Sequence, residues 1–105
     1  MRVRYVPEAR TELTEAAIFY EDRRPGLGER FLAVIRGTEK LVGAFPHSGT
    51  IIGVAGERHA VRRIRVHGFP YSLIYLQRVR TVWILAVAHR RRRPGYWRER
   101  RPASC

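Results

Sequence analysis

Residues 58–97 read RHAVRRIRVHGFPYSLIYLQRVRTVWILAVAHRRRRPGYW, and this stretch decides the fold. It contains three runs rich in β-branched and aromatic residues, 61–67, 71–77 and 81–89, with short turns between them. Such runs predict strands that pair as an antiparallel meander. The run 81–89 is apolar on both faces, so we expect a central strand that is covered on each side.

The residues before this stretch predict one strand and two helices. Residues 1–6 alternate apolar and basic side chains, which is typical of a short strand. Apolar residues then recur at helical spacing in two segments, 7–24 and 27–45, and Pro25 separates them. Two helices joined by so short a turn predict a helical hairpin whose apolar stripes pack on the sheet.

The segment 47–59 lacks a clear periodicity. It is rich in glycine, and we expect a loop there, with at most a short extended piece at 50–54. The whole order predicts an α+β fold: an N-terminal strand, a helical hairpin and a three-stranded antiparallel meander that forms one small sheet. At 105 residues we expect one domain, 1–105, in which residues 98–105 (RERRPASC) form a flexible tail.

Positive charge is concentrated in the second half of the chain. Residues 1–57 carry eight basic and eight acidic side chains, whereas residues 58–105 carry thirteen arginines and one acidic residue, Glu99. The net charge of +12 therefore belongs entirely to residues 58–105. Arginine binds phosphate and carboxylate through paired hydrogen bonds, so this half predicts a polyanion or an acidic protein as partner.

Several classes of protein are disfavoured by what the sequence lacks. The single cysteine, Cys105, allows no disulfide within the chain, and the four histidines show no metal-ligand spacing. No phosphate-loop or nucleophile-elbow motif is present. We also find no signal peptide and no apolar run of membrane-spanning length. We therefore expect a cytoplasmic protein with no metal, no small-molecule cofactor and no membrane partner.

Four motifs carry a resemblance to a known family: EAAIFYEDRRPGLGERFL (15–32), AFPHSG (44–49), FPYSLIY (69–75) and AVAHRRRRPGYW (86–97). They resemble the toxins of bacterial type II toxin–antitoxin systems in the RelE/ParE superfamily. The chain is most similar to the ParE-like branch, often called plasmid stabilisation proteins. The resemblance implies a small growth-inhibiting toxin that is neutralised by a cognate antitoxin wrapped around its surface.

The resemblance implies one of two targets. ParE-like members act on DNA gyrase without known chemistry of their own, which is the reading we favour. RelE-like members are metal-independent endoribonucleases that cleave mRNA in the ribosome. A non-toxic nucleic-acid-binding relative is a third reading, which follows from the charge alone.

Ribonuclease chemistry would need a base, an acid and cations that hold the phosphate. The resemblance implies catalytic roles for Arg63 and Arg65 on the first strand of the meander, for His89 at the end of the last strand, and for Tyr96 near the chain end. Ser72, however, stands where RelE-like enzymes place a phosphate-holding arginine. This departure favours gyrase as the target.

Each candidate residue also has a purely structural explanation. His89 can cap its strand, Tyr96 can pack the chain end on the core, and Arg63 and Arg65 can form a solvated edge or meet an acidic antitoxin. We expect five further arginines to contact the target or a nucleic acid: Arg62, Arg90, Arg91, Arg92 and Arg93.

The two predicted helices carry more apolar surface than a small sheet must cover. Part of this surface could form a groove for an antitoxin helix. The residues that we expect to line it are Leu13, Ala17, Tyr20, Phe31 and Ile35.

Overall fold

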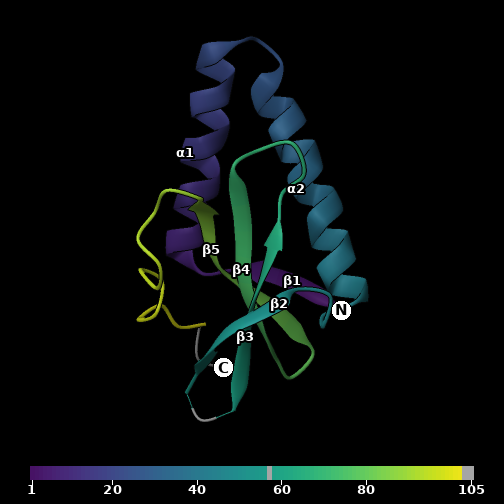
Figure 1. The fold of residues 1–105 in the computed structure, drawn as a ribbon. Coiled ribbons are helices and arrows are strands. Elements are labelled where there is room, and N and C mark those ends of the chain that lie inside the picture. The colour runs from purple at the N-terminus through teal and green to yellow at the C-terminus, as the bar shows by residue number, and fades with distance from the viewer. Residues whose placement is uncertain (57, 103–105) are drawn as a thin grey trace.

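Two helices lie against one face of a five-stranded sheet in the computed structural model, which describes residues 1–56 and 58–102 (Figure 1). The sheet has the order β1-β5-β4-β3-β2, with β1 parallel to β5 and every other pair antiparallel. The elements are β1 (Arg2–Tyr5), α1 (Pro7–Arg23), α2 (Leu27–Ala44), β2 (Thr50–Ala55), β3 (His59–Arg65), β4 (Tyr71–Arg78) and β5 (Thr81–His89).

The α+β class, the N-terminal strand and the helical hairpin are confirmed, but the number of strands in the meander is wrong. Residues 50–55, expected as a loop with a short extended piece, form β2, which pairs with β3. The meander therefore has four strands, and β1 adds the fifth. A register shift between Ile51 and Gly53 breaks the alternation of β2, which explains why its sequence looks irregular.

The turn between the helices depends on two glycines and one carboxylate. Gly26 adopts a left-handed conformation, with φ of 87°, that reverses the chain after Pro25. The Glu21 carboxylate accepts hydrogen bonds from the N–H groups of Gly26 (2.9 Å) and Gly28 (3.0 Å). A Cβ at Gly28 would lie 2.5 Å from the Ala17 carbonyl oxygen, so only glycine allows this close approach of the helices.

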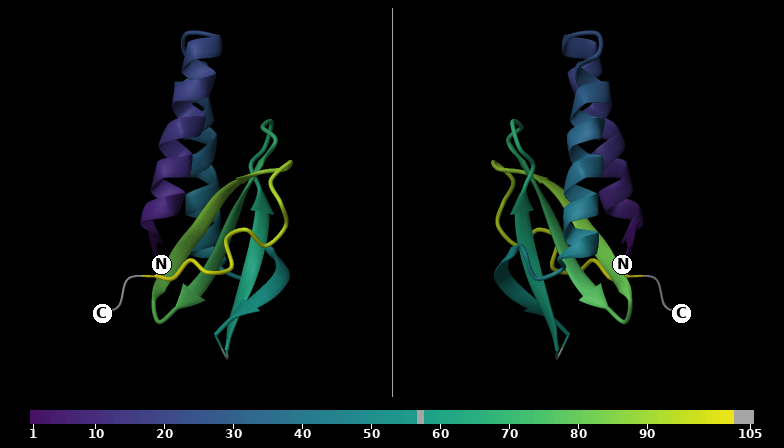
Figure 2. Two further views of the ribbon diagram at one scale, coloured as in Figure 1. Left: turned by 90° about the vertical axis from the view of Figure 1, so that its left-hand side faces the viewer. Right: turned by 90° about the vertical axis from the view of Figure 1, so that its right-hand side faces the viewer.

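The core lies between the helices and the sheet, and β5 is its central strand, as predicted. Six consecutive residues of β5, 82–87, are buried. From the helices, Leu13, Phe31 and Ile35 are buried in the same core. The helical hairpin projects beyond the sheet at the end that carries its turn (Figures 1 and 2). No described helix is both long enough and apolar enough to cross a membrane.

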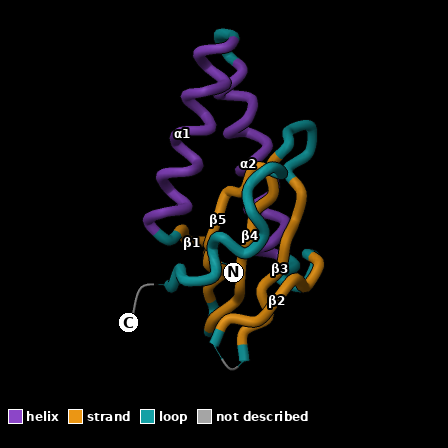
Figure 3. Tube along the Cα trace, turned by 60° about the vertical axis from the view of Figure 1, so that its left-hand side comes forward, coloured by secondary structure: helices purple, strands orange, loops and turns teal. Residues whose placement is uncertain are grey.

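After β5 the chain crosses the strands as an irregular segment, residues 90–102, which we call the C-terminal strap (Figures 2 and 3). Trp97 of the strap is 8% exposed and lies against β2, 3.6 Å from the position that a Cβ at Gly53 would occupy. Pro102 is also buried. Of the predicted flexible tail, residues 98–102 belong to this strap, while residues 103–105, including Cys105, lie outside the described residues.

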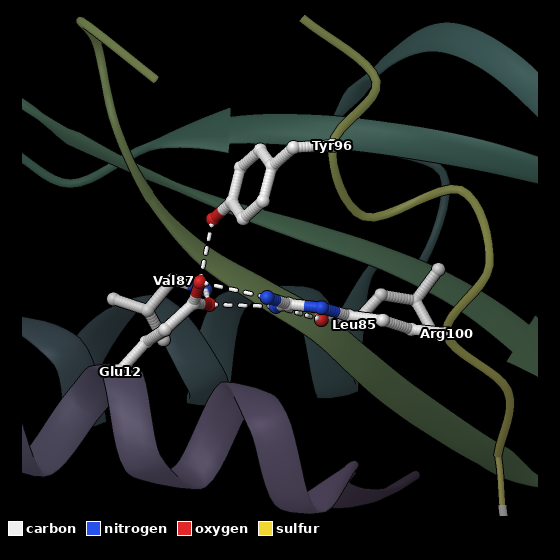
Figure 4. A network of polar contacts seen from close by, with 5 residues as sticks. All are labelled: Glu12, Leu85, Val87, Tyr96 and Arg100. Atoms are coloured by element: carbon white, nitrogen blue, oxygen red, sulfur yellow. Dashed lines mark hydrogen bonds and ion pairs between the residues drawn. The ribbon is translucent and has the colours of Figure 1, made fainter. Parts of the chain in front are cut away.

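The Glu12 carboxylate of α1 fastens the strap to the sheet (Figure 4). Because β1 is shorter than β5, the last backbone groups of β5 have no neighbouring strand on that side. Glu12 accepts a hydrogen bond from the Val87 N–H (3.0 Å), and the Arg100 guanidinium donates one to the Leu85 carbonyl (3.0 Å). Arg100 also pairs with both Glu12 oxygens (2.8 and 3.0 Å), and the Tyr96 hydroxyl donates to Glu12 (2.8 Å).

We expect Glu12→Gln to lower the free energy of unfolding by about 2 kcal/mol, because it leaves the Arg100 charge, 14% exposed, without its counterion. Chemical denaturation measures this loss. Trypsin should also cleave the strap faster in this variant, since the backbone at the exposed Arg98 and Arg101 is freed when the strap detaches. Glu15→Gln, which removes an exposed carboxylate from the same helix, is the matched control. Equal stability of the two variants would contradict the role of Glu12.

The turn between β4 and β5 holds Val79 in the left-handed conformation, with φ of 58°, and leaves it 85% exposed. A β-branched residue is strained there and buries nothing in return. We expect Val79→Gly to raise the free energy of unfolding by about 1 kcal/mol, because glycine adopts this conformation without strain. Urea denaturation measures the gain, and Val79→Ala should give a smaller one. A destabilised glycine variant would show that the turn is not strained.

Candidate functional site

A cavity of about 430 Å³ opens between the sheet and the C-terminal strap. Side chains from β3 and β4 line one side of it, and the strap lines the other. We call it the arginine cavity, because six of its lining residues are arginines: Arg63, Arg65, Arg90, Arg92, Arg93 and Arg98. No aspartate or glutamate of residues 1–56 and 58–102 lines it.

The arginine cavity lies on the face of the sheet away from the helices. Tyr71 packs its ring on Tyr20 of α1 and Phe31 of α2, so it points to the helical face. The next residue along β4, Ser72, therefore points to the opposite face. Ser72 pairs with Arg65 in the register of β3 and β4, which places Arg65 on that open face as well. Arg63, two residues along β3, shares this face.

Five of the cavity arginines have no partner of their own in the described structure. They are exposed, and none makes an ion pair or a side-chain hydrogen bond to another described residue: Arg63, Arg65, Arg90, Arg93 and Arg98. Arg92 instead lies over the Tyr96 ring, 3.9 Å from its centroid. So many unpaired guanidinium groups around one hollow create a strong positive potential that attracts anions.

His89 stands at the rim of the cavity but faces away from the two strand arginines. The register pairs His89 with Tyr71, so both side chains lie on the helical face, and their ring centroids are 5.1 Å apart. His89 Nδ1 accepts a hydrogen bond from the Arg91 N–H (3.1 Å). This hydrogen bond engages one of the two ring nitrogens.

The Tyr96 hydroxyl also has a hydrogen-bond partner, which lies on α1. It donates to Glu12, and burial raises the pKa of this phenol above its usual range, with the hydrogen bond and the negative charge of Glu12 adding to the effect. Tyr96 therefore remains protonated in the folded chain and anchors the strap. The four residues that we considered for ribonuclease chemistry, Arg63, Arg65, His89 and Tyr96, all line the arginine cavity, but the Tyr96 hydroxyl is bound to Glu12.

The other predicted arginines divide into two groups. Three residues of the run 90–93 line the arginine cavity, and the exception is Arg91. Arg62 lies elsewhere, because its guanidinium donates hydrogen bonds to the carbonyl oxygens of His47 (3.2 Å) and Gly49 (2.8 Å). Arg62 therefore fastens the loop that follows α2.

Three of the residues that we expected to line an apolar groove, Leu13, Phe31 and Ile35, are buried. These side chains are only 7%, 0% and 1% exposed, and the core holds them. Ala17 and Tyr20 are half-buried against the same core. The helices bury these side chains against each other and against β1 and β5. The large apolar side chains that remain exposed on and beside the helices are Ile18, Phe19, Leu41 and Phe45.

Sequence reasoning missed two residues that shape the site. Arg98 lines the cavity, and its neighbour Trp97, an apolar residue in a basic segment, was the signal that this segment packs on the sheet. Glu12 holds the strap, but its partners lie 75 and 88 residues further along the chain. No local sequence pattern predicts contacts between residues so far apart in the chain.

The chain was compared with known proteins. No curated protein sequence matches it significantly. Among solved structures, it is similar to a chain of the chromosomal ParDE toxin–antitoxin system from P. aeruginosa, with a TM-score of 0.68 and 18% identity. That match covers 85% of this chain and 95% of the other, and at this identity it shows a shared fold.

A family model decides the classification. Residues 3–94 match the model of the ParE toxin of the type II toxin–antitoxin system parDE. This range includes both helices, all of the strands except the first residue of β1, and the first part of the strap. The chain therefore belongs to the family of ParE toxins of type II toxin–antitoxin systems.

Proposed function

We propose that this protein is a growth-inhibiting toxin of the cytoplasm that acts by binding DNA gyrase, and that a cognate antitoxin neutralises it. Membership of the ParE family supports the toxin and the antitoxin partner. Gyrase is the target that the resemblance to ParE-like toxins implies. The observation that carries the mode of action is the arginine cavity, which gathers six arginines around one hollow and no described acidic residue.

The alternative is a ribosome-dependent endoribonuclease, and Arg63 and Arg65 on one open face favour it in part. Cleavage of RNA without a metal also needs a group that removes the 2′-hydroxyl proton and one that protonates the leaving oxygen. His89 Nδ1 already accepts the Arg91 N–H, and Tyr96 donates its hydroxyl proton to Glu12, with burial and this contact raising the pKa of the phenol. Ser72, which lines the cavity, supplies no positive charge. Binding requires none of these groups.

An acidic antitoxin suits the same surface. The exposed guanidinium groups around the cavity would pair with its carboxylates, and this pairing would block the target. The exposed apolar residues of the helical hairpin would lie at the periphery of such a contact.

We expect induced expression of the chain in a bacterial host to cause DNA breaks while total mRNA stays intact over the first minutes. His89→Ala should keep its toxicity within about twofold, whereas a ribonuclease that used His89 would lose roughly a hundredfold. Growth curves and RNA and DNA integrity, followed in parallel, measure both effects. Early mRNA cleavage that disappears in His89→Ala would establish the ribonuclease instead.

We expect the product of the neighbouring gene to bind the purified chain and to restore growth when the two are co-expressed. Because carboxylate–arginine pairs are screened by salt, the affinity should fall as ionic strength rises. Calorimetry at low and high salt measures the affinity and its salt dependence, and growth curves of the co-expressing host measure the rescue. A neighbouring gene product that has no affinity for the chain would exclude it as the antitoxin.

A further inference from the structure

The arginine cavity has a shape that a flat protein–protein contact does not require. It is a hollow with two walls, one formed by the sheet and one by the C-terminal strap, and its volume falls in the range of small-ligand sites. Between the arginines lie apolar and aromatic residues: Ile52, Phe69, Ile74 and Trp97. Cations around an apolar hollow suit a ligand that carries both negative charge and a planar apolar group.

We infer that the arginine cavity binds a segment of single-stranded DNA, with backbone phosphates on Arg63 and Arg65 and a base in the hollow. This inference rests on the proposed function in one respect: gyrase, the proposed target, holds DNA, so DNA would lie close to the bound toxin. Binding of the strand itself is a property of this chain alone.

The two strand arginines are placed for a phosphodiester backbone. Residues two apart on one face of a strand are separated by about 7 Å. Successive phosphates of an extended nucleic-acid strand have a similar separation, so Arg63 and Arg65 can each take one phosphate with two parallel hydrogen bonds. Arg90 and Arg93, also exposed and unpaired, face the same hollow from the other wall.

The size of the hollow favours a single strand over a duplex. A cavity of about 430 Å³ has room for a nucleotide but not for a double helix. The bases of a duplex are paired and stacked inside it, so none can enter the hollow unless it is flipped out at a cost of unstacking. A single strand offers its bases freely, and apolar contact with a base tolerates any sequence.

The test is the fluorescence anisotropy of a labelled twelve-nucleotide oligo-dT on titration with the purified full-length chain. Arg63→Ala/Arg65→Ala should weaken binding about tenfold or more. Each arginine that neutralises one phosphate adds about 0.7 to the slope of log affinity against log salt, so this variant should lower the slope by about 1.4. Circular dichroism melts establish that the variant is folded.

The matched control is Arg30→Ala/Arg36→Ala, which removes the same charge from exposed positions of α2. It should change the affinity by no more than about twofold. Equal losses in the two variants would reduce the binding to general charge and overturn the inference. Tighter binding of a duplex, of oligo-U RNA, or of poly-glutamate at equal charge would overturn it too.

Binding of single-stranded DNA and action on gyrase are measured in separate experiments. Oligo-dT binding needs no gyrase, whereas accumulation of cleaved gyrase–DNA complexes is measured with purified gyrase and plasmid. A chain that traps gyrase but ignores oligo-dT would refute only the cavity assignment. A chain that binds oligo-dT through Arg63 and Arg65 but leaves gyrase unaffected would refute only the target.

Discussion

One half-buried carboxylate, that of Glu12, links helix α1, strand β5 and the C-terminal strap. Glu12 gives the open edge of β5 the hydrogen-bond acceptor that a neighbouring strand would have supplied, and it is the counterion of Arg100. Through Arg100 and Tyr96 it also fixes the C-terminal strap. Because the strap is one wall of the arginine cavity, the shape of the functional surface depends on a helix residue that does not line it.

The parts of the fold that could be predicted are those with a strong local pattern. The run 81–89 is apolar on both faces, and only a covered central strand can accommodate it. The helical stripes are equally plain. β2 was missed because the shift at Gly53 interrupts its alternation, and Glu12 resembles an ordinary acidic residue near the start of a helix. Its role comes entirely from residues distant in the sequence.

For the site too, composition and local alternation could be predicted from the sequence, whereas the register of the sheet could not. The excess of arginine after residue 57 predicted a cationic surface, and the alternation of β3 placed Arg63 and Arg65 together. Whether His89 would join them depends on the register across β3, β4 and β5, which no single segment encodes. The register places it on the other face, beside Tyr71. His89 nevertheless lines the same cavity as Arg63 and Arg65, at its helical side.

β2 ends the sheet and exposes Ile51 (55%) and Val54 (65%) along with its unpaired backbone edge. Such an edge invites the corresponding strand of another molecule, which is the usual start of aggregation. The net charge of +12 opposes that encounter, since two copies repel each other before their edges meet. The arginines thus keep copies of the chain apart as well as forming a binding surface. A partner that neutralises them must also cover the β2 edge if the complex is not to aggregate.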